Sequence, residues 1–257
     1  MKYKTFERNH VIIPGRKNLL EEFLSPPHKS KFKCNSNSED ALTWSVFDIL
    51  RNLDESALKE AIDRIIEDSF EGNPCFQIDE VSNDCIHIGK RYNFKNESTE
   101  VDASIETKQF IIFFEAKLYS SMSLADPPIK PHDQLAKKLR VGGALSLASH
   151  KKFVFIIIDI GPFERTYRHL AKERALSRGS GYKDKWKTAW WFNYYKFGRN
   201  NSMRPIRDVF TGLENVDTGE IARNMGWITW TDIFKTVLQT VVTCGLNINA
   251  KQVRQLG

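Results

Sequence analysis

Apolar side chains recur at helical spacing in two consecutive stretches of the chain. Residues 39–53 repeat them every three or four positions, and residues 55–69 do the same. This periodicity predicts two helices, each with one apolar face. Ser38 or Asn37 can cap the first helix and Asp54 the second, because short polar side chains accept hydrogen bonds from the unpaired N–H groups at a helix start.

A different pattern follows, in which residues 76–120 are typical of β-structure. Three stretches rich in β-forming residues, at 85–94, 99–107 and 109–119, are separated by short polar connections. Short connections favour antiparallel hairpins, since parallel neighbours need a long crossover. The sequence therefore predicts a meander of three antiparallel strands.

The second half of the chain returns to helical patterns around one very apolar strand. Residues 131–149 predict a helix, and residues 151–161 predict a strand. The core of that strand is almost wholly apolar, which indicates burial on both faces, as in a central parallel strand. The remaining expected segments are a short strand and turn at 11–15, a loop at 25–38, a basic helix at 165–178, an aromatic and basic stretch at 183–197, a looser stretch at 200–226 and an amphipathic helix at 231–242.

The order of these elements predicts the fold class. Two helices, three strands, a helix, a strand and further helices are accounted for by an α/β fold in which one mixed sheet is flanked by helices. We expect a single domain over 1–257, with a core at about 39–160 and a basic aromatic extension at about 161–257. No clear domain boundary is visible, although the segment from about 180 onward could be an appendage.

Composition narrows the class of protein without naming its chemistry. Hydrophobic residues make up 41% and charged residues 27%, which is ordinary for a globular protein. No apolar run approaches the ~20 residues needed to cross a bilayer, and the polar N-terminus does not look like a secretory signal. Four cysteines lie far apart without a C-x-x-C pair. We therefore expect a cytoplasmic protein with reduced thiols and no membrane contact.

Charge is distributed unevenly along the chain. Residues 130–207 hold 18 Lys and Arg against 5 Asp and Glu, whereas the remaining residues hold 20 against 27. A basic region in a protein with a net charge of only +6 suggests a polyanionic partner such as nucleic acid. The alternative is a solvated basic surface without a ligand.

Two opposite charges end one of the most apolar strands of the sequence, where Phe110–Phe114 leads into Glu115 and Lys117. Strand alternation places Glu115 and Lys117 on one face. An isolated pair of this kind is most often a charge pair at the rim of a sheet. However, Asp102 lies 13 residues before Glu115, inside the preceding strand, and a hairpin would bring the two carboxylates together. Adjacent, partly buried carboxylates repel each other unless a cation joins them.

The residue types at this strand end suit metal-assisted attack on phosphorus. Two carboxylates and a backbone carbonyl suit Mg²⁺, which prefers oxygen ligands, and Mn²⁺ is expected to substitute for it. A lysine two residues after the glutamate can orient or deprotonate the attacking water and offset the negative charge that develops. Acyl transfer is a poor fit, since no Ser–His pairing occurs at motif spacing. The pattern therefore favours phosphodiester hydrolysis.

The D-x12-E-A-K pattern on consecutive strands, followed by a helix and an apolar strand, resembles the PD-(D/E)xK nuclease superfamily, also called restriction-endonuclease-like. The resemblance covers about residues 39–160. It implies a three-layer α/β/α core of the order αβββαβ. It also implies that Asp102, Glu115 and the Ala116 carbonyl bind metal and that Lys117 serves the water.

The resemblance also implies accessory residues, and it has one departure. An acidic residue on the first core helix often joins the metal in this family, and Glu39 matches it; the alternative is a first-turn acid that suits the helix dipole. Gln134 matches a glutamine that often supports the site, or it is an ordinary polar residue near a helix start. Asp84 is a weaker alternative to Asp102. Val101 stands where the family name has proline, a position that varies in such families.

Basic residues after residue 130 are candidates for contacts with a nucleic-acid backbone, and their joint excess is stronger evidence than any one of them. These candidates are Lys137, Lys138, Arg140, Arg165, Arg168, Lys172, Arg174, Arg178, Lys183, Lys185, Lys187, Lys196 and Arg199. Each is alternatively a solvated charge. The aromatic residues of 183–197 fall at helical spacing, which favours core packing over base stacking.

The sequence thus predicts a Mg²⁺-dependent nuclease with DNA as the favoured substrate, and analogy with the superfamily suggests restriction, phage defence or repair. Two alternatives stay open. One is a catalytically silent nucleic-acid-binding module with the same fold. The other is a protein-interaction subunit whose basic region meets an acidic partner. A homodimer or a partner subunit fits a duplex cutter, which needs two sites.

Overall fold

A five-stranded mixed sheet forms the centre of the protein. The computed structural model describes residues 1–118, 129, 131–159 and 206–245. The strands are β1 (Ile86–Phe94), β2 (Glu97–Glu106), β3 (Phe110–Ala116), β4 (Lys152–Asp159) and β5 (Met225–Thr229), and they lie side by side in chain order. β1, β2 and β3 are antiparallel, whereas β3, β4 and β5 run parallel to one another. The predicted three-stranded meander and parallel apolar strand are confirmed.

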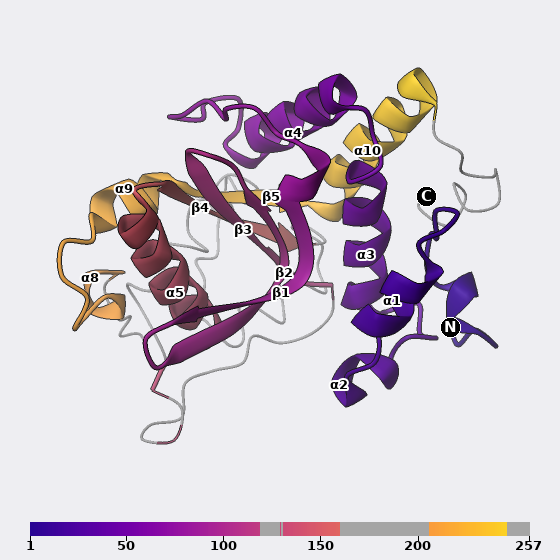
Figure 1. Ribbon diagram of the computed structural model, residues 1–257, viewed down its shortest axis with the longest axis horizontal. Coiled ribbons are helices and arrows are strands. Elements are labelled where there is room, and N and C mark those ends of the chain that lie inside the picture. The colour runs from indigo at the N-terminus through magenta and orange to yellow at the C-terminus, as the bar shows by residue number, and fades with distance from the viewer. Residues whose placement is uncertain (119–128, 130, 160–205, 246–257) are drawn as a thin grey trace, which may run out of the picture.

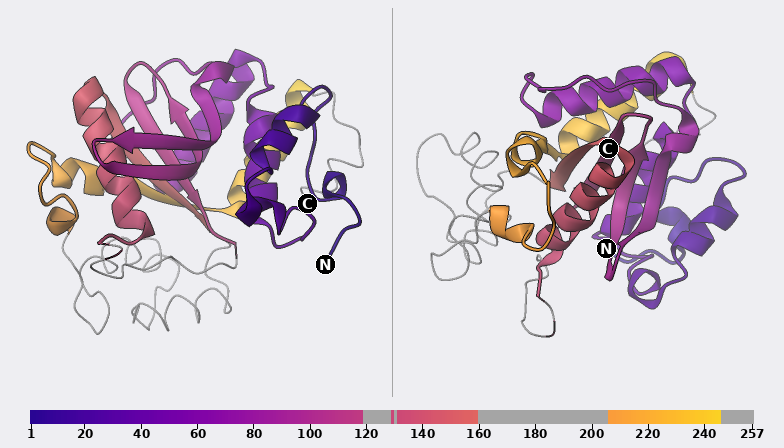
Figure 2. Two further views of the ribbon diagram at one scale, coloured as in Figure 1. Left: turned by 60° about the horizontal axis from the view of Figure 1, so that its bottom comes forward. Right: turned by 60° about the vertical axis from the view of Figure 1, so that its left-hand side comes forward.

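Helices cover both faces of this sheet (Figure 1). α3 (Glu39–Leu50), α4 (Glu55–Ser69) and α10 (Trp230–Cys244) pack together on one face. α5 (Gln134–Ser149) lies on the other face, and the views in Figure 2 show the sheet between the two sets of helices. The expected α/β fold with a mixed sheet flanked by helices is therefore confirmed.

Strand alternation divides the apolar side chains of β3 between two cores. Ile112 and Phe114 belong to the cluster under α3, α4 and α10, whereas Ile111 and Phe113 belong to the cluster under α5. Every residue of β3 is buried, and the same division of neighbouring residues holds in β4. Burial on both faces explains why these two strands read as continuous apolar runs.

Side-chain caps fix the starts of α3, α4 and α5. Ser38 accepts a hydrogen bond from the N–H of Ala41, and Asp54 accepts one from the N–H of Ala57, as the sequence predicted. Asp133 accepts one from the N–H of Ala136 and so makes Gln134 the first residue of α5. A cap sets the start of a helix and the facing of its first turn.

The N-terminal segment differs from the sequence prediction. The predicted strand at the start of 11–15 is wrong, because residues 11–13 form no strand, whereas the expected turn is present at 14–15. Two short helices were not predicted: α1 (Lys17–Phe23), and α2 (Pro27–Ser30), which lies inside the predicted loop at 25–38. Leu20 and Leu24 of this segment bury against Trp44 of α3, and this tertiary packing explains how such short helices persist.

The segment before α10 contains a strand that the sequence prediction missed. Residues expected to be loose form α8 (Ile206–Val209), α9 (Thr218–Arg223) and β5. β5 has only five residues and runs directly into α10, so it is too short to show a period of its own. The predicted helix at 165–178 and the aromatic stretch at 183–197 lie outside the described residues.

Two further observations concern the cysteines and the character of the helices. The four cysteines are free thiols, in agreement with the expected absence of disulfides. Within the described ranges, no helix combines the length and the apolar character that crossing a membrane requires.

Candidate metal and catalytic site

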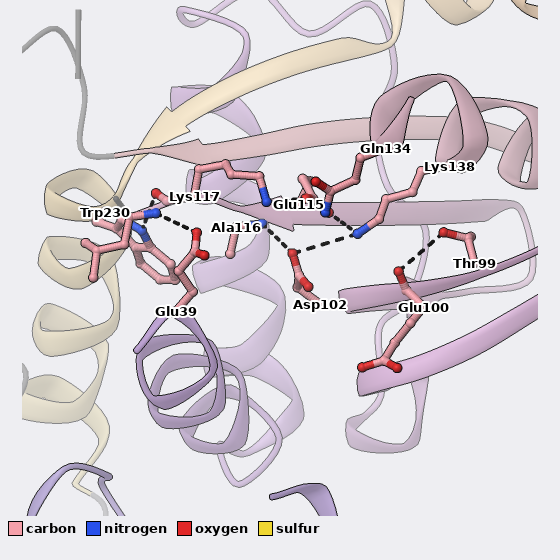
Figure 3. A network of polar contacts seen from close by, with 11 residues as sticks. Glu39, Thr99, Glu100, Asp102, Glu115, Ala116, Lys117, Gln134, Lys138 and Trp230 are labelled. Carbon is pink, nitrogen blue, oxygen red and sulfur yellow. Dashed lines mark hydrogen bonds and ion pairs between the residues drawn. The ribbon is translucent and has the colours of Figure 1, made fainter. Parts of the chain in front are cut away.

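The β2–β3 hairpin brings two carboxylates together at the end of β3. Ala103 pairs with Phe114, and the next step along the two strands places Asp102 opposite Glu115. Asp102 Oδ2 accepts a hydrogen bond from the backbone N–H of Ala116 at 2.8 Å, which fixes its direction (Figure 3). Asp102 keeps 32% of its side chain exposed, whereas the side chain of Glu115 is completely buried.

Lys117 lies directly after β3 with its backbone held on two sides. Its N–H donates to the carbonyl of Ile158 in β4 at 2.7 Å, and its carbonyl accepts from the indole N–H of Trp230 in α10 at 3.1 Å. Its ammonium lies 2.7 Å from Glu115 Oε1. Glu115 and Lys117 therefore face the same way, as strand alternation predicted.

The N-terminal part of α5 supplies two more side chains to Glu115. Gln134 donates from Nε2 to Glu115 Oε1 at 2.6 Å. Lys138 lies one helical turn later and donates to Glu115 Oε2, and its ammonium is also 3.8 Å from Asp102 Oδ2. Glu115 therefore receives donors at both oxygens.

The role of Lys138 was not predicted, because the sequence assigned this residue only to a nucleic-acid backbone. The signal that could have found it is its spacing from Gln134. Residues four apart on a helix share a face. If Gln134 meets the end of β3, Lys138 must lie on the same side of α5.

Glu39 reaches the end of β3 from the opposite side. Its Oε2 accepts a hydrogen bond from the N–H of Leu118 at 2.7 Å, and its charge acts on Lys117. Of the site residues, Glu39, Asp102, Lys117 and Gln134 line a cleft of about 500 Å³. The residues that line it are Phe32, Asn35, Asn37, Ser38, Glu39, Asp40, Asp102, Ala116, Lys117 and Gln134.

The two carboxylates of the hairpin have opposite pKa shifts. Burial would raise the pKa of Glu115, but the charges of Lys117 and Lys138 outweigh it and lower this pKa to about 2. Burial, followed by the negative charge of Glu115, raises the pKa of Asp102 to about 7. Glu115 is thus held as a carboxylate, and Asp102 can be neutralised easily.

Lys117 stays charged although it is buried. Burial would lower its pKa, but the carboxylate of Glu115, and then those of Glu39 and Asp102, raise it above the usual value of 10.5. An ammonium held in this way is a donor and a positive charge at neutral pH. It is not a base.

The donor set at this strand end fits a hard divalent cation. Carboxylate oxygens of Asp102 and Glu115 and the carbonyl of Ala116 are the ligand types that Mg²⁺ prefers. Burial and then the charge of Glu115 disfavour the charged form of Asp102, and a cation beside it would offset both effects. In the described part of the chain, no group of three or more His, Cys, Asp or Glu side chains is arranged to hold a metal ion. Glu39 Oε2 is held by the N–H of Leu118, and its expected role as a metal ligand stays a prediction.

The predicted nucleic-acid contacts on α5 divide into one surface residue and two interior residues. Lys137 is exposed, whereas Lys138 and Arg140 are buried. Arg140 donates to both oxygens of Glu97 and to the carbonyls of Val209 and Thr211. These contacts tie α5 to β2, to α8 and to the segment after it, so Arg140 has a structural role, and its expected contact with a phosphate stays a prediction.

The other predicted basic contacts, Arg165 to Arg199, lie outside the described residues.

Comparisons of the chain with protein-family models, curated proteins and solved structures gave no match. The interpretation of the cleft therefore depends on its own residues.

Proposed function

We propose that this protein is a metal-dependent nuclease that hydrolyses phosphodiester bonds, with DNA as the favoured substrate. One observation carries the proposal: Asp102, Glu115, Lys117 and Gln134, which come from two strands and a helix, converge at the end of β3 beside a cleft. The order α3 to β4 around this point supports a restriction-endonuclease-like core. Restriction, phage defence and repair are the roles that the resemblance suggests.

The carboxylates and the Ala116 carbonyl would hold the Mg²⁺ or Mn²⁺ ion. Asp102 is directed by the N–H of Ala116 and borders the cleft, so it is the more accessible ligand. Glu115 lies deeper and is kept ionised by its lysine partners. Such an ion, when bound, supplies positive charge to the phosphate and promotes ionisation of water.

Lys117 acts in this proposal as a charged donor. Its raised pKa keeps the proton on the ammonium at neutral pH in the metal-free site, which supports a role as a donor. It borders the cleft and can hold that water or a phosphate oxygen by a hydrogen bond. It also offsets the negative charge that develops in the transition state. Of the two roles that the sequence left open, the raised pKa in the metal-free site favours positioning over deprotonation.

Gln134 and Glu39 act as positioning residues. Gln134 holds one oxygen of Glu115, and its own place is set by the Asp133 cap at the start of α5. Glu39 holds the N–H of Leu118 and so fixes the chain just after Lys117. Preorganised groups of this kind contribute to rate because they need no rearrangement during the reaction.

A nucleic-acid partner is supported by the charge of the sequence. Residues 130–207 carry the whole excess of positive charge, and the exposed Lys137 lies next to the cleft-lining helix start. Backbone contacts from such a region make binding fall steeply with salt.

A second candidate function is a catalytically silent nucleic-acid-binding module. The observation in its favour is that Glu115 is already hydrogen-bonded by Lys117, Lys138 and Gln134. A carboxylate held in this way needs no metal to be stable. This alternative predicts binding that weakens with salt and no cleavage with any metal.

The test is cleavage of labelled single- and double-stranded DNA and RNA in Mg²⁺, Mn²⁺ or EDTA. Lys117→Met removes the charge at the site, and Lys108→Met removes an exposed charge from the far end of the β2–β3 hairpin. The proposal predicts metal-dependent cleavage by the wild type and Lys108→Met, and a loss of about 100-fold or more in Lys117→Met. Binding without cleavage by all three proteins would favour the silent module.

A further inference from the structure

Lys138 occupies the position between the two carboxylates of the site. Its ammonium bonds to Glu115 Oε2 and lies 3.8 Å from Asp102 Oδ2 (Figure 3). It therefore bridges the same pair of side chains that the proposed function assigns to a divalent cation. Lys117 does not share this position, since it approaches Glu115 at the other oxygen, Oε1.

Lys138 is also an unusual residue for its place on the helix. Only 3% of its side chain is exposed, and lysine is almost never fully buried unless it is paired. The neighbouring Lys137 on the same helix is exposed to solvent. The inward position of Lys138 is sustained by its two carboxylate partners, because an unpaired ammonium in the interior is strongly unfavourable.

We propose that Lys138 is a built-in counter-cation that holds Asp102 and Glu115 together without metal and competes with the divalent ion for them. This inference rests on the proposed function, since it assumes that the two carboxylates are the metal ligands. An ammonium and Mg²⁺ at the same pair of carboxylates compete for the lone pairs that point between them, and their positive charges repel at short range. We expect Lys138 to move away from Glu115 when the ion binds. The affinity of the site for metal is set by this exchange.

The exchange of the Lys138 ammonium for the divalent ion explains why the site has a second lysine in addition to Lys117. Without metal, Lys138 limits the repulsion between Asp102 and Glu115 and keeps both ligands in place. With metal, the displaced ammonium remains near the start of α5, beside the cleft that Gln134 lines. Metal binding and the release of Lys138 are then one coupled step.

The test is a titration of the purified full-length protein with Mn²⁺, followed by electron paramagnetic resonance of the free ion. Lys138→Met removes the ammonium but keeps a long, flexible side chain. Lys137→Met makes the same change of charge one residue earlier at an exposed position. We expect Lys138→Met to bind Mn²⁺ at least about tenfold more tightly than the wild type, and Lys137→Met to change affinity less than about twofold.

A second measurement separates competition from simple damage to the fold. Thermal unfolding in EDTA should show that Lys138→Met is less stable than the wild type, because it leaves two carboxylates facing each other. Saturating Mn²⁺ should then raise the melting temperature of Lys138→Met by more than that of the wild type. Lys138→Arg, which keeps the charge, should show no gain in Mn²⁺ affinity.

The outcomes distinguish this inference from the proposed function. Equal or weaker Mn²⁺ binding by a folded Lys138→Met protein overturns the competition, even if the wild type cleaves DNA. Tighter binding by Lys138→Met supports the competition, even if no protein cleaves any nucleic acid. Absence of Mn²⁺ binding by every variant overturns the competition and also removes the metal from the proposed function.

Discussion

Asp102 accepts a hydrogen bond from the backbone N–H of Ala116, at 2.8 Å between Oδ2 and N, and this bond joins β2 to the last residue of β3. The paired residues of β2 and β3 end at Ala103 and Phe114, so the ladder alone would let the two strands separate beyond this point. The side chain of Asp102 closes the hairpin at the point where its carboxylate must face Glu115. One contact thus serves both the fold and the site.

Replacing Asp102 by Asn should stabilise the protein when no metal is present. The amide oxygen of Asn keeps the acceptor for Ala116, while the charge that opposes Glu115 is lost. Because the pKa of Asp102 is raised to about 7 from 3.8, wild-type stability falls as pH rises through this range. The gain should be at least about 1 kcal/mol at pH 8 and should vanish near pH 4.

Urea unfolding in EDTA at pH 8 and pH 4 measures this difference. Ser104→Ala, two residues along β2, is a control for general disturbance of the strand, and its effect should not depend on pH in this way. Equal stability of wild type and Asp102→Asn at pH 8 would show that burial and Glu115 do not disfavour the charge of Asp102.

Replacing Glu115 by Gln should destabilise the protein, in contrast to the change at Asp102. This change leaves the ammonium groups of Lys117 and Lys138 without their shared partner in a buried position. Breaking a buried ion pair on one side costs about 3–5 kcal/mol. The double variant Glu115→Gln, Lys138→Met should recover part of that loss, and denaturant unfolding of the four proteins in the cycle measures the coupling. Strict additivity of the two changes would contradict the pairing of Glu115 with Lys138.

Acidification should destabilise the N-terminal segment through His10. This residue is buried, and the Nδ1 atom of its ring contacts the carbonyl oxygen of Phe6 at 2.8 Å. Burial lowers its pKa from 6.5 to about 4, so the neutral ring is favoured in the folded state and stability is lost as pH falls from about 6.5 to 4.

Between pH 7.5 and pH 5 this residue should account for about 2 kcal/mol of lost stability. Unfolding of wild type and His10→Gln at both pH values measures the contribution, since glutamine does not titrate there. The exposed His150, replaced in the same way, provides the control. A His10→Gln protein that loses as much stability as the wild type would contradict the assignment.

The close packing of α5 on the sheet should depend on Gly142. A Cβ atom at this position would lie 2.1 Å from the ring of Phe153 in β4. Gly142→Ala should therefore destabilise the protein by about 1–3 kcal/mol, although alanine favours helix. In a Phe153→Leu background the same change should have a smaller effect, because the ring is gone. An equal effect in both backgrounds would show that Phe153 is not the cause.

Sequence patterns predicted the larger elements because those patterns are long and agree with capping residues at the helix starts. α4 occupies the predicted residues 55–69, where an apolar face of four turns follows the Asp54 cap. α1, α2 and β5 were missed because each is short and is stabilised by contacts far away in the sequence, such as those of Leu20 with Trp44. Such elements carry too few residues to show a period.

The candidate site was predictable only as far as strand alternation reaches. Alternation and the hairpin place Asp102, Glu115 and Lys117 together from sequence. Strand alternation does not reach α5: the side of Lys138 follows only from its spacing to Gln134, and the inward facing of Arg140 depends on how α5 is rotated on the sheet. That rotation is set by contacts such as Gly142 with Phe153, and the sequence alone shows only a basic helix.

The most direct test of the nuclease proposal compares Mg²⁺-dependent DNA cleavage by the wild type and Asp102→Asn under single-turnover conditions. The account predicts that Asp102→Asn is folded and at least as stable, yet cleaves at least about 100-fold more slowly, because a metal ligand is lost. Equal cleavage by the two proteins would contradict the assignment of this site. Absence of cleavage by the wild type on every DNA tested would contradict the proposed activity itself.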